Sequence, residues 1–145
     1  MTTTVHEERM DSDARDVIAI INTSPDTVGL LSELLERAGF LVVTAYTHSI
    51  RDGSVDLQAF LRTHRPRVIV YDIAPPYEPN WHLFQHMAAM PVMAGRQFVI
   101  TSTNARQVEG FAGPQQHVYE IVGKPFDLDQ IVQATREALK IRPSR

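Results

Sequence analysis

Short apolar runs alternate along this chain with segments whose apolar residues recur at helical spacing. Residues 17–21 form a continuous apolar run, which is typical of a strand covered on both faces. Similar runs lie at residues 40–45, 67–71, 98–100 and 118–122. The pattern therefore predicts five strands, each followed by a segment long enough for a helix.

Capping residues mark the predicted helices. Ser24 is the expected N-cap of the first helix, Pro25 suits its first turn, and Gly39 stands where a helix-ending glycine belongs. Ser54 is the expected cap of the second helix, which has to end before Pro66. We therefore expect the second helix to carry its apolar residues between these two positions.

Three more helices are predicted in the second half of the chain. Asn80 is the expected cap of the third, and Asp127 that of the last. A weaker pattern over residues 105–111 predicts the fourth, although Gly110, Gly113 and Pro114 interrupt it. Strands alternating with helices predict an α/β domain, with a parallel sheet between two layers of helices.

The domain is predicted to span residues 16–141, with tails at 1–15 and 142–145. A length of 145 residues suits one domain, and 43% apolar with 21% charged residues is an ordinary globular balance. The net charge of -3 argues against a basic face for nucleic acid or membranes. With no secretion signal or membrane-length apolar run, we expect a cytoplasmic protein.

The sequence contains no cysteine, so disulfides, a thiolate nucleophile and a cysteine-based zinc site are excluded. His82 and His86 have a spacing that can bind a metal, but no third ligand is evident, and a solvated or interfacial pair is the preferred interpretation. Trp81 is either an anchor at the start of a helix or a partner contact. No glycine-rich phosphate loop follows the first strand.

The functional crevice of a parallel sheet lies at the carboxyl ends of its strands. A carboxylate, a hydroxyl and an ammonium that meet there suit phosphoryl chemistry, since the first can accept the group and the others can hold its oxygens. The polar residues that leave the predicted strands are Asn22, Thr23, Asp72, Thr101, Ser102 and Lys124.

With these residues, the chain from Asp16 to about Leu139 resembles the receiver domains of bacterial response regulators. Asp72, in D-I-A-P-P, resembles the phosphoacceptor. Thr101, at the end of FVIT, resembles the hydroxyl residue that contacts the phosphoryl group, and Lys124, in K-P-F, resembles the invariant lysine. The resemblance implies a flavodoxin-like (βα)5 three-layer sandwich with sheet order 2-1-3-4-5.

The sequence departs from the family where receivers carry an acidic pair that helps to bind Mg²⁺. Asn22 and Thr23 occupy those positions, and Mg²⁺ prefers carboxylate oxygens. Asp26 is more suited to the first turn of the helix than to the site. We therefore expect Mg²⁺ at Asp72 to bind weakly or not at all, and Asp72 to pair with Lys124 in the resting state.

Two further departures concern switching. Ile121 occupies the position of the family's switching aromatic, and Tyr119 lies farther from the site. Asn80 stands where many receivers have glycine, after an unusually stiff loop at residues 75–79. The resemblance together with these departures predicts a pseudo-receiver without the usual phosphorylation switch.

The leading hypothesis is a stand-alone, non-enzymatic receiver-like module in two-component signalling, acting in trans on a histidine kinase, phosphotransfer or output protein. We expect no fused output domain, because the sequence ends soon after the last helix. The resemblance implies partner or homodimer contacts on the fourth helix, fifth strand and fifth helix. The alternatives are a working phosphoacceptor at Asp72, with Asn22 and water completing a weak Mg²⁺ site, and a flavodoxin-like small-ligand binder or enzyme.

Overall fold

The computed structural model describes residues 15–112, 118–123 and 128–141. A single five-stranded parallel sheet forms the middle of the molecule, in the order β2-β1-β3-β4-β5. The predicted fold class and strand order are therefore confirmed. The strands are β1 (Val17–Asn22), β2 (Leu41–Tyr46), β3 (Val68–Ile73), β4 (Gln97–Ser102) and β5 (Val118–Gly123).

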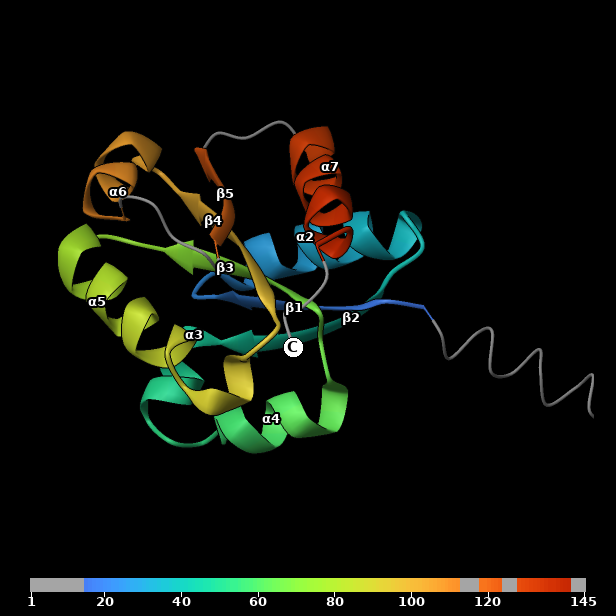
Figure 1. Cartoon of the computed structure of the whole chain (residues 1–145), viewed down its shortest axis with the longest axis horizontal. Coiled ribbons are helices and arrows are strands. Elements are labelled where there is room, and N and C mark those ends of the chain that lie inside the picture. The colour runs from blue at the N-terminus through green and yellow to red at the C-terminus, as the bar shows by residue number, and fades with distance from the viewer. Residues whose placement is uncertain (1–14, 113–117, 124–127, 142–145) are drawn as a thin grey trace, which may run out of the picture.

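Helices cover both faces of the sheet, as Figure 1 shows. On one face lie α2 (Pro25–Arg37) and α7 (Leu128–Leu139), which contact each other. The opposite face is covered by α3 (Thr47–Arg51), α4 (Leu57–His64), α5 (Tyr77–Ala88), the 3-10 turn η1 (Pro91–Met93) and α6 (Ala105–Ala112). The result is three layers with the sheet in the middle.

Alternation along the strands divides the core into two clusters. Ile18 and Ile20 of β1 pack under α2 and α7, whereas Ala19 and Ile21 pack under α4, α5 and α6. All four side chains are fully buried. Continuous apolar runs are needed because both faces of the sheet are covered.

The first helix begins and ends as the sequence predicts. The Ser24 side chain accepts a hydrogen bond from the backbone N–H of Thr27, and Pro25 opens α2. Gly39 follows the C-cap with a φ of 101°, a left-handed conformation that glycine adopts at little cost. These assignments are confirmed.

The expected cap of the second helix is wrong. Asp56, not Ser54, caps α4, since its carboxylate accepts from the backbone N–H of Ala59 at 3.2 Å. Ser54 instead donates from its hydroxyl to Asp52 Oδ1 at 2.7 Å. That turn follows α3, a short helix that the sequence pattern did not predict. The predicted end before Pro66 is confirmed, because α4 ends at His64.

The expected cap of the third helix is also wrong. Helix α5 begins at Tyr77 with Pro76 at the N-cap, so part of the predicted stiff loop is helical. Asn80 lies inside the helix, and its Nδ2 donates to the backbone carbonyl of Ala74 at 2.7 Å. Trp81 is 1% exposed and belongs to the core, which makes it a packing residue. The expected cap Asp127 lies outside the described residues.

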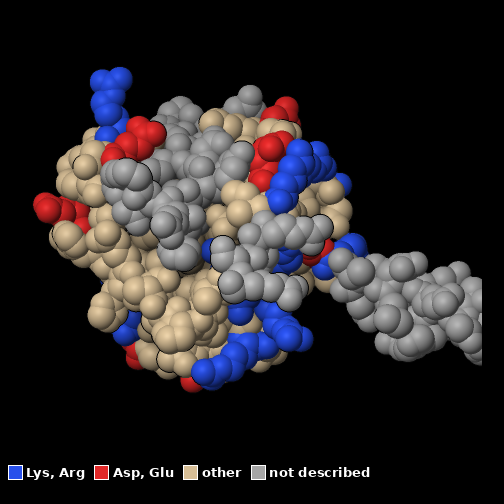
Figure 2. Space-filling model, in the orientation of Figure 1, with Lys and Arg blue, Asp and Glu red and all other residues tan. Residues whose placement is uncertain are grey.

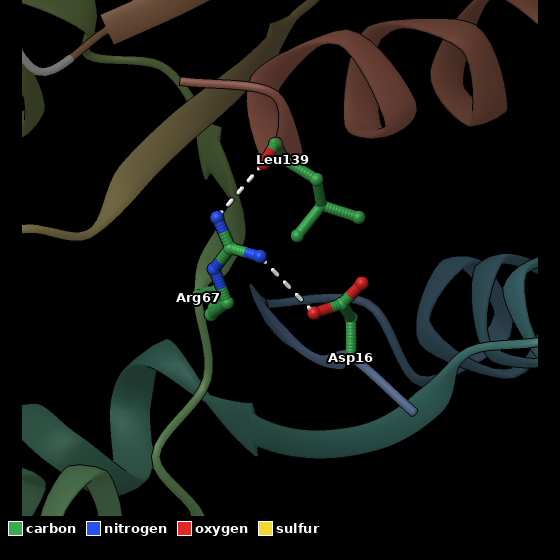
Figure 3. Close-up of polar contacts among 3 residues, drawn as sticks. All are labelled: Asp16, Arg67 and Leu139. Carbon is green, nitrogen blue, oxygen red and sulfur yellow. Dashed lines mark hydrogen bonds and ion pairs between the residues drawn. The ribbon is translucent and has the colours of Figure 1, made fainter. Parts of the chain in front are cut away.

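Arg67 joins three parts of the chain at the amino-terminal edge of the sheet (Figure 3). One guanidinium nitrogen forms a 3.2 Å ion pair with Asp16, just before β1. The other donates a 2.8 Å hydrogen bond to the carbonyl of Leu139, at the end of α7. Arg67 therefore fixes the last helix to the start of the sheet.

The surface carries charges of both signs. On the face in Figure 2, basic and acidic side chains are interspersed and leave uncharged areas between them. None of the helices in the described ranges is long and apolar enough to cross a membrane.

Candidate functional site

Asp72 and Thr101 lie next to each other at the carboxyl ends of β3 and β4, where they are partners in the strand register. Thr101 Oγ1 donates a 2.6 Å hydrogen bond to Asp72 Oδ1. Asp72 is 6% exposed and Thr101 is fully buried. The contact is short because its acceptor is a carboxylate, and it holds that carboxylate at the edge of the sheet.

Asn22 lies on the neighbouring strand at the same level. Ile20 of β1 is the register partner of Val70 of β3, and both side chains pack in the cluster under α2 and α7. Two residues further along each strand, alternation places Asn22 and Asp72 on that same face. Asn22 is 2% exposed, so the end of β1 presents a buried amide at the position where the resemblance implies an acidic residue.

The carbonyl oxygen of this amide already has a hydrogen-bond partner. The backbone N–H of Ser24 donates to Asn22 Oδ1 at 3.0 Å. This local bond turns the chain from β1 into α2. Thr23, the second position of the missing acidic pair, is exposed, and so is Asp26 in the first turn of α2.

Two of the predicted site residues are not placed with their side chains. Lys124 lies outside the described residues, so its predicted pairing with Asp72 stays a prediction. Ile121 is on β5 as the register partner of Ile100, but its side chain is not described. In the sequence, Lys124, the third residue of the expected constellation, comes directly after β5.

A second layer of polar contacts connects the loops after β3 and β4. The Tyr77 hydroxyl hydrogen-bonds the Thr103 hydroxyl. Ser102 Oγ donates to the carbonyl of Ile73 at 3.0 Å and accepts from the backbone N–H of Asn104 at 3.2 Å. Sequence reasoning missed Tyr77 and Thr103, although both follow strand ends that it had singled out.

These side chains form a poor ligand set for a magnesium ion. Mg²⁺ requires near-octahedral oxygen coordination and usually at least one or two carboxylates. Asp72 offers one carboxylate, of which one oxygen already accepts from Thr101. Asn22 offers a neutral oxygen that accepts from Ser24. Among the residues with described positions, no three His, Asp or Glu side chains gather closely enough to hold a metal ion.

Comparison with known proteins identifies structures that share this fold. No protein-family model and no curated protein sequence matches the chain. Among solved structures, a sensor protein from Polaromonas sp. JS666 is similar with a TM-score of 0.68 and 22% identity, over 87% of this chain and 97% of that one.

Two more structures show the same likeness. A response regulator from Thermotoga maritima has a TM-score of 0.68 and 16% identity, over 88% of this chain and 99% of that one. A CheY-like response regulator receiver domain from Methylobacillus flagellatus has a TM-score of 0.64 and 16% identity, over 86% of this chain and 99% of that one. The chain therefore shares the fold of response-regulator receiver domains.

Proposed function

We propose that this chain is a receiver-type signalling module that acts through protein contacts, not catalysis, with weak or no Mg²⁺-dependent phosphorylation at Asp72. The observation that carries the proposal is the state of Asn22. A buried amide, bonded to the backbone of Ser24, lies beside the buried Asp72–Thr101 pair where an acidic ligand would be needed.

The electrostatic consequence is direct. An incoming phosphoryl donor and Asp72 are both anionic, and a divalent cation normally offsets that repulsion during phosphoryl transfer. Here Asp72 and Thr101 keep the arrangement of acceptor and hydroxyl, while the neighbouring strand β1 contributes no negative charge with which to hold the cation. Transfer to Asp72 would therefore be slow even if the acceptor were reachable.

The resemblance to receivers suggests partners in trans: a histidine kinase, a phosphotransfer protein or an output protein. It also suggests the face formed by α6, β5 and α7 as the contact surface, or as a homodimer interface. Arg106, Gln107 and Glu109 are exposed on α6. A polar surface of this kind suits reversible association better than an obligate interface.

Intact-protein mass spectrometry after incubation with acetyl phosphate tests the proposal. Wild-type protein should gain little or no phosphoryl group, with or without Mg²⁺. The double variant Asn22→Asp/Thr23→Asp, which restores the acidic pair, should gain one when Mg²⁺ is present and lose this ability when Asp72→Ala is added. A stoichiometric, Mg²⁺-dependent gain by the wild type, abolished by Asp72→Ala, would establish a working phosphoacceptor instead.

A further inference from the structure

Three arginines gather at the end of α4, at the amino-terminal edge of the sheet. Arg62 and Arg65 are exposed, and Arg65 is the C-cap of the helix. Arg96, just before β4, reaches the same place, since its guanidinium donates a 2.6 Å hydrogen bond to the Pro66 carbonyl. Figure 2 shows basic side chains lying together at the bottom of the view, where α4 lies in Figure 1. We call Arg62, Arg65 and Arg96 the basic cluster.

No carboxylate of the described residues neutralises the basic cluster. Within residues 15–112, 118–123 and 128–141, none of its three arginines forms an ion pair. Burial lowers the pKa of the Arg96 guanidinium, and the charge of Arg65 acts in the same direction, which places two like charges near each other. The end of α4 offsets this repulsion only in part, because a helix C-terminus carries about half a negative charge. An anionic partner would offset the rest.

A cleft lies between the basic cluster and the point where the described chain begins. Its volume is about 480 Å³, and it is lined by Arg15, which precedes β1, and by Thr63 and His64 at the end of α4. Glu36 is the one acidic residue among those described as lining it. The chain therefore enters the domain beside the end of α4.

The segment that precedes Arg15 is strongly acidic. Its charged residues are Glu7, Glu8, Arg9, Asp11 and Asp13. The rest of the chain carries equal numbers of acidic and basic residues, so residues 1–14 account for the whole net charge of -3. An extended chain spans up to about 3.5 Å per residue, so even Glu7 can lie up to about 28 Å from Arg15. All four carboxylates can therefore reach an edge of the domain that lies beside Arg15.

We propose that the acidic segment, residues 1–14, binds the basic cluster of its own chain through ion pairs with Arg62, Arg65 and Arg96. Exposed ion pairs are individually weak, but the covalent link holds the segment at a high local concentration. Three observations carry the proposal: the opposite charges of segment and cluster, the entry of the chain beside α4, and the length of the segment. The bound segment would cover the basic cluster, so an acidic partner protein would have to displace it.

Paramagnetic broadening in NMR of the ¹⁵N-labelled whole chain tests this contact. The chain has no cysteine, so Met10→Cys provides one site for a nitroxide label among the acidic residues. The amide signals of Thr63, His64 and Arg96 should lose about half their intensity in about 0.1 M NaCl and regain it in about 1 M NaCl, because the screening length falls from about 10 Å to about 3 Å.

Two sets of charge changes should restore the signals at low salt. Adding Arg62→Gln/Arg65→Gln removes the cations, and adding Glu7→Gln/Glu8→Gln/Asp11→Asn/Asp13→Asn removes the carboxylates. The matched control is Arg51→Gln/Arg106→Gln, which removes two exposed charges from helices that follow the carboxyl ends of β2 and β4. It should leave the broadening unchanged.

Three results would overturn the proposal. The first is the absence of broadening at these amides, or broadening that is equal at both salt concentrations. The second is broadening that neither set of charge changes reduces. The third is broadening of an unlabelled ¹⁵N chain by an added spin-labelled ¹⁴N chain, which would assign the contact to a second copy.

Discussion

Thr101 Oγ1 donates a 2.6 Å hydrogen bond to Asp72 Oδ1, with both side chains buried at the ends of adjacent strands. The two residues are 29 positions apart in sequence. Parallel pairing of β3 with β4 brings them together, since it places both at the same register level. The pair is therefore a product of sheet topology.

Replacing this hydroxyl tests the energetic role of the pair. Thr101→Val keeps the shape of the side chain but removes the hydroxyl that donates to the buried carboxylate of Asp72, so the free energy of unfolding should fall by about 1–3 kcal/mol. Thr101→Ser, which keeps the hydroxyl, should lose less. Urea denaturation of both variants measures the difference, and equal loss would show that the hydrogen bond contributes nothing.

Restoring the acidic pair should restore a magnesium response. In Asn22→Asp/Thr23→Asp, the carboxylate introduced at position 22 can still accept from the Ser24 N–H while adding a negative charge beside Asp72. Mg²⁺ at about 10–30 times its Kd should then stabilise the variant by about 1–2 kcal/mol. Thermal unfolding with and without Mg²⁺ measures this effect. The wild type should not respond, and adding Asp72→Asn should remove the response.

The side chains of Arg67 and Arg37 should contribute differently to the free energy of unfolding. Arg67 joins Asp16 and the Leu139 carbonyl, so Arg67→Met should cost about 1–2 kcal/mol. Arg37 forms an exposed i,i+4 pair with Glu33, so Arg37→Met should cost less than about 0.5 kcal/mol. Similar losses in chemical denaturation would show that Arg67 does not fix α7 to the sheet.

Thr47→Val should stabilise the protein, whereas Thr101→Val should destabilise it. It removes a buried hydroxyl that has no partner among the described residues, which should raise the free energy of unfolding by about 1 kcal/mol. Differential scanning calorimetry of the two variants provides the comparison. A destabilised Thr47→Val would indicate that the hydroxyl is satisfied in solution.

Replacing Gly29 and Gly39 with alanine should change the stability of the protein in opposite directions. Gly29 lies inside α2, and a Cβ there would meet no atom within 4 Å, so Gly29→Ala should stabilise by about 0.5–1 kcal/mol. Gly39 has equal space but a φ of 101°, so Gly39→Ala should cost about 1 kcal/mol. Urea unfolding of both variants separates backbone conformation from crowding; an equal effect would show that φ is not decisive.

The sheet could be predicted from the sequence because burial on both faces requires continuous apolar runs. Helix starts were less predictable. Ser54 and Asp56 are both good caps by type, but Ser54 bonds Asp52 and Asp56 caps α4. Asn80 is a good cap by type, yet it bonds a carbonyl from inside α5.

The candidate site was also predictable only in part. Parallel strand ends made the meeting of Asp72 with Thr101 predictable. The hydrogen bond from the Ser24 N–H to Asn22, and the lack of a partner for the Thr47 hydroxyl among the described residues, depend on where tertiary packing places single atoms. A periodic pattern carries no information at that level.

The proposed function requires that Mg²⁺ binds weakly or not at all beside Asp72. NMR of the ¹⁵N-labelled whole chain, titrated with MgCl₂ and then with beryllofluoride, tests this directly through the amides of Asn22, Asp72 and Thr101. We predict no saturable shift up to about 10 mM Mg²⁺ and no beryllofluoride complex. Saturable shifts of these amides in low-millimolar Mg²⁺, followed by a stable beryllofluoride complex, would contradict it.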